Sequence, residues 1–396
     1  MSAGEADGAA RIAGYMDARA RGEYARLAIG CFLVAFMNAH STLLSVIFAR
    51  AGHDLHATGL LITAIAVPVI VCALFSSEVA ARVGVLWTLR IAMALTTLGF
   101  ASLQFTKGDF AAAYASRAVQ GVGQGLFLSA VITYAQSRLN ATRFVFLLGV
   151  LSAVMPLTQA IAPPFGEWII GRWGDGFLFL LVSVPALVGI ALTFTLRPLD
   201  RPLKTRGLDL FASWRPAHLE PLTAVLLNGT MFGYATAYFA SAFQARGLPL
   251  AAFFTASLVT MFSSRVLALR GVDAVNPRIL VAGGLALLSA GFVAVALAGR
   301  TVWPVVAGGI VFGFGYSLTY PMLSAWMSEG VAPERRAGPQ AWLNGFFNFG
   351  LFAMPLPATW LIAATDYETV MLVLAALNLA FALWMAARGL AGRSTE

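Results

Sequence analysis

The positive charges of this chain are sorted along the sequence in a way that a membrane-spanning protein requires. Apolar stretches of about 20 residues alternate with short polar breaks, and Arg and Lys collect in every second break. Of the 26 Lys and Arg residues, 20 lie in these alternate breaks and the two tails, and only five lie in the other breaks. Cytoplasmic loops retain Lys and Arg, so the pattern predicts that both termini lie in the cytoplasm.

The composition agrees with a bilayer as the main solvent. The chain is 59% hydrophobic and 11% charged, with a mean hydropathy of +0.79, whereas soluble domains average about 25% charged residues. Topology therefore explains the net charge of +8 better than nucleic-acid binding does. Cys31 and Cys72 lie in apolar stretches and the four histidines do not cluster, so we expect no disulfide, metal site or cofactor.

Twelve apolar segments are long enough, or nearly so, to cross a bilayer as helices. They lack the alternation of a barrel strand, so the predicted fold class is an all-α integral membrane protein with twelve transmembrane helices. The segments are 26–48, 58–79, 87–106, 110–135, 144–170, 176–196, 219–244, 250–268, 279–298, 303–327, 338–363 and 368–388.

The sequence also repeats. FSSEV at 75–79 recurs as FSSRV at 262–266, an offset of 187. Gly121 and Gly123 recur as Gly313 and Gly315 at an offset of 192, as does Pro163 at position 355. We interpret this as a duplication of a six-helix bundle, with a substrate site near the midplane between the two copies. The predicted parts are a tail at 1–25, bundles at 26–196 and 219–388, a basic Pro-rich linker at 197–218, and a tail at 389–396.

The fourth segment carries the clearest motif. Its run RAVQGVGQG at 117–125 resembles the fourth-helix motif of the major facilitator superfamily, and the resemblance extends over essentially the whole chain. It implies a role for Arg117 in proton coupling or charge gating. The alternative is a structural arginine bonded to backbone carbonyls. The glycines Gly121 and Gly125 form a small-xxx-small face for close helix packing.

Two further motifs match this family in part. SEVAARVG at 77–84 resembles its loop motif between the second and third helices, with Glu78 and Arg82 placed to pair and Gly84 at the end, which implies a conformational latch. APPFG at 162–166 resembles the fifth-helix motif of its efflux antiporters and favours export. The alternative for Pro163, Pro164 and Gly166 is a simple packing kink.

Energy coupling has few candidate residues. No GxxxxGK[ST] run is present, so a gradient must drive transport if it is coupled. His40 is the best titratable group inside a span. It lies about 12 Å from the outer end of the first segment and Arg117 about 10 Å from that of the fourth, at 1.5 Å per residue. We therefore expect the two to share a site. The alternatives are a packing role for His40, and Glu167 as the proton carrier.

The sequence thus predicts a secondary transporter that exports a small organic molecule by proton antiport, with a proton-coupled uptake carrier as the alternative. One buried Arg favours an anionic, zwitterionic or siderophore-like compound, although neutral drugs stay open. We find no nucleophile or paired carboxylates for an enzyme. The expected setting is a bacterial inner membrane, as a monomer. Further candidate cavity residues are Asn38, Gln120, Gln124, Asn228, Tyr316, Tyr320 and Asn344.

Overall fold

The computed structural model describes residues 18–138, 141–197, 215–268, 276–331 and 337–391, and in these ranges the chain consists of helices and turns without a β-strand. Most of the predicted tails and of the linker at 197–218 lies outside the described residues. The elements are α2 (Ala18–Ala39), η1 (His40–Leu43), α3 (Leu44–Arg50), α4 (Leu55–Thr63), α5 (Ala66–Val83), α6 (Val85–Thr106), α7 (Phe110–Arg138), α8 (Ala141–Trp173), α9 (Leu178–Thr193), η2 (Pro216–His218), α10 (Leu219–Arg246), α11 (Leu250–Ala268), α12 (Pro277–Ala296), α13 (Val302–Met327), α14 (Ala337–Phe352), α15 (Pro355–Ala364) and α16 (Tyr367–Ala391).

Every predicted segment coincides with one helix or with a helix that is interrupted once. Within the described ranges, eight segments are long and apolar enough to cross a membrane, and the shorter apolar helices at Leu178–Thr193 and Leu250–Ser264 add to them. The all-helical membrane class is therefore confirmed. The number of twelve crossings and the cytoplasmic termini stay predictions.

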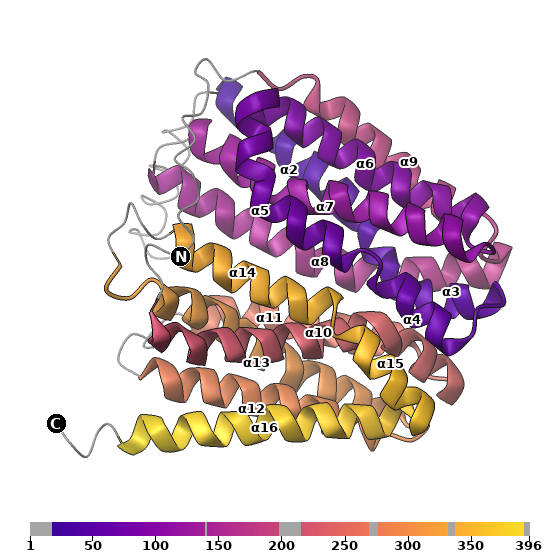
Figure 1. Cartoon of the computed structure of the whole chain (residues 1–396), viewed down its shortest axis with the longest axis vertical. Helices are drawn as coiled ribbons and strands as arrows, with labels where there is room; N and C mark the ends of the chain where they lie inside the picture. Colours follow the sequence, from indigo (N-terminus) through magenta and orange to yellow (C-terminus); the bar gives the residue numbers. More distant parts are fainter. Residues whose placement is uncertain (1–17, 139–140, 198–214, 269–275, 332–336, 392–396) are drawn as a thin grey trace, which may run out of the picture.

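The helices form two sets with the same internal contacts. In the first set, α2 packs on α8 and α9, α6 on α7 and α9, and α5 on α7. In the second set, α10 packs on α14 and α16, α12 on α13 and α16, and α11 on α13. Figure 1 shows the first set, in indigo to magenta, beside the second, in red to yellow. Equivalent positions in the chain thus make equivalent contacts.

The two sets meet mainly at one end of the molecule. There η1 and α3 contact α10, α4 contacts α15, and α8 contacts α11. Figure 1 shows α3, α4 and α15 together at the right, opposite the end where α16 finishes, and the two sets diverge toward that opposite end. We call the end that holds α3, α4 and α15 the distal end. The charge pattern predicts that it faces away from the cytoplasm.

Glycine contacts show that the repeat is exact in space. A Cβ on Gly121 would lie 2.7 Å from the carbonyl oxygen of Ile65, and one on Gly313 would lie 2.2 Å from that of Ser257. Both the glycines and their partners are 192 residues apart. The same offset relates the contact of Gly123 with the Ala92 carbonyl, at 2.5 Å, to that of Gly315 with the Gly284 carbonyl, also at 2.5 Å.

This register corrects one part of the sequence interpretation. Gly125 packs against Cys72 of α5, and 192 residues later Ser317 contacts Ser264 of α11, with 2.6 Å between their hydroxyl oxygens. The second and eighth segments are therefore aligned at 192 and not at 187. The likeness of 75–79 to 262–266 does not reflect structural equivalence.

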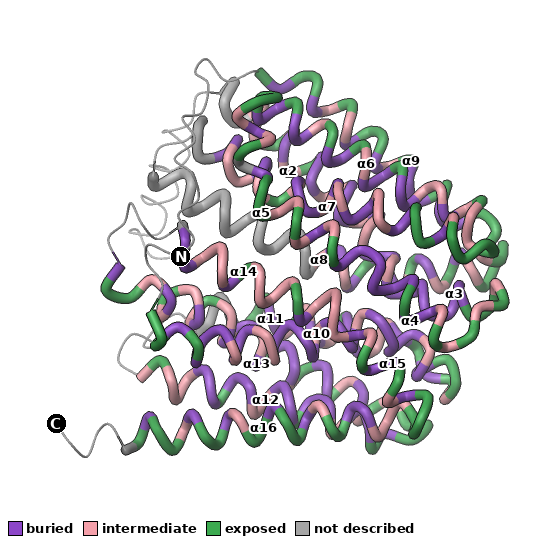
Figure 2. Tube along the Cα trace, viewed as in Figure 1, coloured by how far each residue is buried: buried purple, intermediate pink, exposed green. Residues whose placement is uncertain are grey.

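Burial follows the same arrangement. Figure 2 shows buried positions where helices face each other and exposed positions along the outer side of α16 and the other peripheral helices. Many exposed residues are large and apolar, such as Phe105 at 81% and Trp303 at 74% exposure. Exposing these apolar side chains costs free energy in water but not in the hydrocarbon of a bilayer. The surface therefore suits contact with lipid.

The close glycine contacts predict a clear stability difference between two Gly→Ala variants. Gly313→Ala must push α13 away from α11, so we expect a loss of about 1–3 kcal/mol and a lower unfolding temperature. Gly283→Ala adds the same methyl group to α12 with no atom within 4 Å, and should be neutral or stabilising by roughly 0.5–1 kcal/mol. Thermal unfolding followed by a dye that reacts with the buried Cys31 thiol measures both. Equal melting temperatures would contradict the packing described.

Candidate functional site

Arg117 binds backbone carbonyls at a break in the helix of the second segment. Between α4 and α5 the helix breaks at Ala64 and Ile65, just before Pro68, which has no N–H to donate to the Ala64 carbonyl. The break leaves carbonyls of the last α4 turn without helical partners. Arg117, on α7, donates from Nε to the Leu61 carbonyl at 3.3 Å and from Nη2 to the Ile62 carbonyl at 3.1 Å.

The charge of this arginine is balanced by dipoles. Arg117 is only 3% exposed, and no carboxylate among the described residues forms an ion pair with it. It sits at the C-terminal end of α4, where the helix dipole is equivalent to about half a negative charge. Two carbonyls in a buried setting strengthen this attraction. In this structure Arg117 therefore makes the contacts of a structural arginine that is bonded to backbone carbonyls.

A short polar chain links Arg117 to the first segment. Its Nη1 donates to Oε1 of Gln120, one turn along α7, and Nε2 of Gln120 donates to Oδ1 of Asn38 on α2 at 2.7 Å. Asn38 is partly exposed, whereas Arg117 and Gln120 are buried. The amide of Asn38 is thus the accessible end of a chain that reaches a buried charge. Gln124 lies one turn further along α7 with its Oε1 unpaired.

In the second set, the equivalent contact between α13 and α11 is made without a charged residue. The position equivalent to Arg117 is Gly309, and the one equivalent to Leu61 is Phe253, both at the offset of 192. A Cβ on Gly309 would lie 2.6 Å from the Phe253 carbonyl oxygen, so the backbones touch directly. Here α11 continues unbroken from Leu250 to Ala268. In the first set, where the helix is broken between α4 and α5, the side chain of Arg117 takes the place of this direct backbone contact.

His40 begins η1 and faces α8. Its Nδ1 lies 2.9 Å from the Phe36 carbonyl, which can only accept, so Nδ1 carries a proton. In the neutral ring Nε2 is then an acceptor, and it is buried without a partner. The rings of Phe36 and Phe165 stand 4.9 and 6.2 Å from the imidazole, centroid to centroid. A Cβ on Gly166 would lie 2.8 Å from Cδ2 of His40.

The geometry separates His40 from the Arg117 chain. His40 packs on α8, while Asn38, two residues earlier on α2, turns toward α7 and Gln120. Residues two apart on a helix point in nearly opposite directions. The expected shared site of His40 and Arg117 is therefore not formed by these contacts. Close packing explains the glycine at position 166, because a side chain there would overlap Leu43 and the imidazole of His40.

Glu167 follows Gly166 and reaches the second set. Its Oε1 accepts a hydrogen bond from the backbone N–H of Leu250, the first residue of α11, at 3.3 Å. Helix α8 itself runs unbroken through Pro163 and Pro164, so these prolines do not end it. The contact places a carboxylate from one set at the N-terminus of a helix from the other, at the distal end.

The second set offers amide and aromatic groups. Tyr320 donates to Oδ1 of Asn344 at 2.5 Å, and Nδ2 of Asn348 donates to the Asn344 carbonyl at 2.9 Å. The ring of Tyr316 packs against that of Phe232 in a tilted arrangement, with 5.1 Å between ring centroids. Asn228, on α10, is fully buried with both amide atoms unpaired. An unpaired buried amide is costly, so this position suits a bound water or a ligand group.

The predicted loop latch is weak in this structure. Arg82 and Glu78 approach to 3.7 Å, but their side chains are 80% and 60% exposed. Exposed pairs of this kind contribute about 0–1 kcal/mol. Gly84 adopts φ +92° between α5 and α6, a value that favours glycine. The motif therefore forms a tight corner with a surface ion pair.

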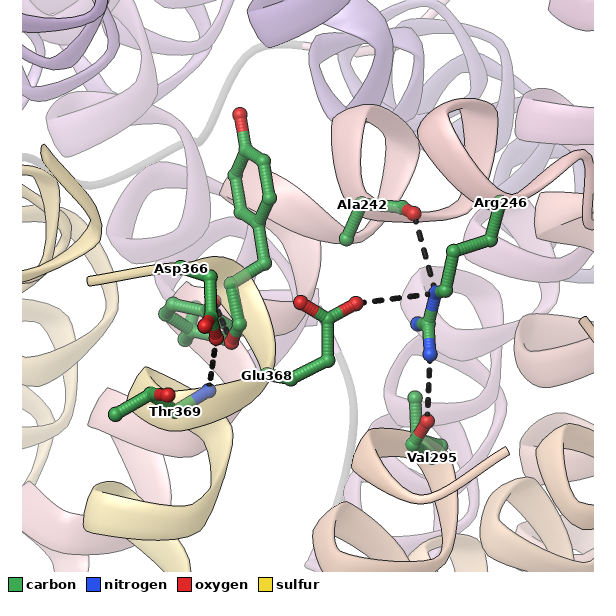
Figure 3. A network of polar contacts seen from close by, with 8 residues as sticks. Ala242, Arg246, Val295, Asp366, Glu368 and Thr369 are labelled. Carbon is green, nitrogen blue, oxygen red and sulfur yellow. Dashed lines mark hydrogen bonds and ion pairs between the residues drawn. The ribbon is translucent and has the colours of Figure 1, made fainter. Parts of the chain in front are cut away.

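Sequence reasoning missed the groups that hold α10 in place. Arg246, near the end of α10, pairs with Glu368 at 3.3 Å and donates to the Val295 carbonyl at 2.9 Å. Asp366 caps α16 through the Thr369 N–H at 2.6 Å. Figure 3 shows Arg246 between Glu368 and the end of α12. Glu368 and Val295 are far from Arg246 in the sequence, so no local motif predicts these two contacts, whereas the Asp366 cap is local.

Comparison with known proteins decides the family. The Major Facilitator Superfamily profile matches residues 27–299. The chain belongs to the major facilitator superfamily. No curated protein sequence matches it significantly. As a member of this family it is a multi-pass membrane protein and a secondary transporter, and not an enzyme.

Solved structures agree on the fold of this major facilitator protein. The crystal structure of a D-xylose–proton symporter superimposes with a TM-score of 0.75 at 15% identity, covering 92% of this chain and 96% of that chain. The crystal structure of a POT family transporter in complex with 5-aminolevulinic acid gives a TM-score of 0.74 at 12% identity, covering 92% and 95%. At these identities the likeness concerns the fold alone.

The contacts of Arg117 predict how its variants behave. Arg117→Ala leaves two buried carbonyls unpaired, each costing about 1–3 kcal/mol, so we expect a lower unfolding temperature and loss of transport. Arg117→Lys keeps the charge but not the fork that reaches two carbonyls, and should restore part of the stability. Thermal unfolding of the purified variants measures this. An unchanged melting temperature in Arg117→Ala would refute the capping role.

Proposed function

We propose that this major facilitator protein exports a small organic molecule across a bacterial inner membrane by proton antiport, through alternating access between its two helix sets. In this proposal the chain crosses the membrane twelve times, with both termini in the cytoplasm. The boundaries expected from sequence, 26–196 and 219–388, mark the two moving bodies. The protein acts as a monomer in the bilayer.

The observation that carries the proposed coupling is the unpaired nitrogen of His40. Nε2 is a buried acceptor that lies close to Gly166, and Nδ1 is hydrogen-bonded to the Phe36 carbonyl. Histidine changes its charge near neutral pH, and a titratable group inside the membrane is what proton coupling requires. Arg117 and Gln120 then act by keeping Asn38 and the broken second segment in position.

The contacts favour a substrate with neutral hydrogen-bonding groups. Arg117 is buried and three of its nitrogens already donate, so it does not present its charge to an anion in this conformation. The remaining candidates are amides and phenols, namely Asn38, Gln124, Asn228, Tyr316, Tyr320 and Asn344. These groups and the neighbouring rings suit a compound with an apolar body and a few polar groups.

The direction rests on the fifth-helix run at 162–166, which resembles that of efflux antiporters. An uptake carrier is the second candidate. The similar D-xylose–proton symporter shows that this fold also accommodates symport. The direction of proton movement relative to substrate separates the two.

A transport assay tests coupling. A thermal-shift screen with neutral, anionic, zwitterionic and cationic compounds first identifies a ligand. In proteoliposomes with an imposed pH gradient, the wild type should move that compound against the proton flow. His40→Gln removes the titratable nitrogen, so we expect loss of the response to the gradient while exchange of labelled for unlabelled compound continues.

The matched control is His56→Gln, an exposed histidine at the start of α4. It should keep the full gradient response. Movement of compound and protons in the same direction would replace export by uptake. A His40→Gln protein that responds to the gradient like the wild type would remove His40 from the mechanism.

A further inference from the structure

Among the contacts that close the distal end, two are related to each other by the repeat. In one, Glu167 of α8 meets Leu250 at the start of α11. In the other, Thr359 of α15 meets Gly59 of α4, where an added Cβ would lie 2.1 Å from the Thr359 hydroxyl. Glu167 and Thr359 are 192 residues apart, and Gly59 follows the equivalent of Leu250 by one residue. Both contacts join one helix set to the other.

The chemistry of the two contacts differs. Thr359 is fully buried and donates to the Pro355 carbonyl at 3.0 Å, and Tyr238 of α10 contacts its hydroxyl. Steric fit against Gly59 therefore holds this side. On the other side a carboxylate accepts from a first-turn N–H of α11, which helical bonds leave free. The positive end of the helix dipole adds to this contact only while Glu167 is ionised.

Helix α11, which Glu167 contacts at its first residue, is held in place by other contacts within the second set. Leu250 follows the turn after α10, where Gly247 adopts φ +69°. Arg246, just before that turn, is held by Glu368 and by the Val295 carbonyl (Figure 3). Force on the Glu167 contact is therefore transmitted to α12 and α16. Releasing Glu167 therefore removes a polar link from the α8–α11 side of the distal closure.

We propose that Glu167 is a titratable latch that holds the distal end closed when ionised and releases it when protonated, while the equivalent Thr359 contact stays insensitive to pH. The inference rests on the proposed alternating access. It assigns pH control of opening to one of two symmetry-related contacts. Glu167 is a positioning residue here, because its contact is with a helix end and not with substrate.

Other titratable or charged groups on the neighbouring elements must be separated from Glu167. Helix α11 has none in its first three turns, and α9 has none along its length. The elements packed against α8 carry further such groups: His40 in η1, Tyr114, Arg117, Tyr134 and Arg138 in α7, and Arg19, Arg21, Glu23, Tyr24, Arg26 and Cys31 in α2, while α8 itself also carries Arg143 and Arg172. The distal loops and helix ends add Arg50, His53, Asp54, His56, Lys107, Asp109, Asp175, Tyr234, Tyr238, Arg246, Arg300, Asp366, Tyr367 and Glu368. Histidine is the residue type that ordinarily changes its charge near neutral pH, so His40→Gln, His53→Gln and His56→Gln are the necessary controls.

Spin labels on symmetric positions report the opening. Gly108 and Arg300 are exposed, 192 residues apart, and lie in the distal loops of the two sets. With both changed to Cys in a Cys31→Ala, Cys72→Ala background, pulsed electron spin resonance in liposomes gives their distance at pH 8 and pH 5. We expect the ratio of long to short distances in the wild type to rise at pH 5, on the order of fivefold.

The variants give opposite expectations. Glu167→Gln and Glu167→Thr, which copies the residue of the second set, should show the open ratio at both pH values. Gly59→Ala should raise the ratio at both pH values and keep the pH response. The His40→Gln, His53→Gln and His56→Gln variants should also keep it. The latch is overturned if the wild type shows no pH response, or if both Glu167 variants respond like the wild type. Distances that stay short in every variant, Gly59→Ala included, would instead defeat alternating access itself.

Discussion

Every interaction described above depends on the requirement that backbone groups inside the membrane find partners within the protein. A helix satisfies this by itself, but an interrupted helix does not. The break before Pro68 frees the carbonyls of Leu61 and Ile62, and Arg117 supplies the missing donors from α7. A buried charge is costly in lipid, yet here two carbonyls and a helix C-terminus compensate for it. The break and the arginine are thus one structural unit.

The comparison between the two helix sets shows what that unit adds. Both sets use the same glycine contacts at the same offset, so the frames are equivalent. The second set has Gly309 and an unbroken α11 where the first has Arg117 and a broken second segment. The first set therefore carries the polar chain to Asn38, whereas amide and aromatic groups dominate the second. A duplicated frame has diverged by changing which groups fill equivalent places.

The same divergence appears where the sets meet. A steric contact and an ionisable contact occupy equivalent positions at the distal end, Thr359 on Gly59 and Glu167 on Leu250. One side can then respond to protons while the other only limits how closely the helices approach. His40 lies beside the Glu167 contact. Its unpaired Nε2 is close to Gly166, the residue that precedes Glu167. The two titratable groups proposed for coupling and for the latch therefore lie close to the contacts between the two helix sets.

Sequence alone predicted the membrane class, the helix positions and the duplication. Hydropathy, charge bias and glycine spacing are visible in the sequence, and they determine how segments insert into the bilayer and pack there. The sequence also singled out Arg117, His40 and Glu167, because charged residues in apolar segments are rare. It placed His40 with Arg117 from depth alone, but no hydrogen bond or ring contact joins the two side chains, since depth says nothing about the direction in which a side chain points. Only the tertiary structure decided that Arg117 binds carbonyls of another segment, that α10 is anchored through Arg246, and that Glu167 and Thr359 are equivalent. Those facts depend on which helix faces which, a relation between residues distant in the chain that no local pattern encodes.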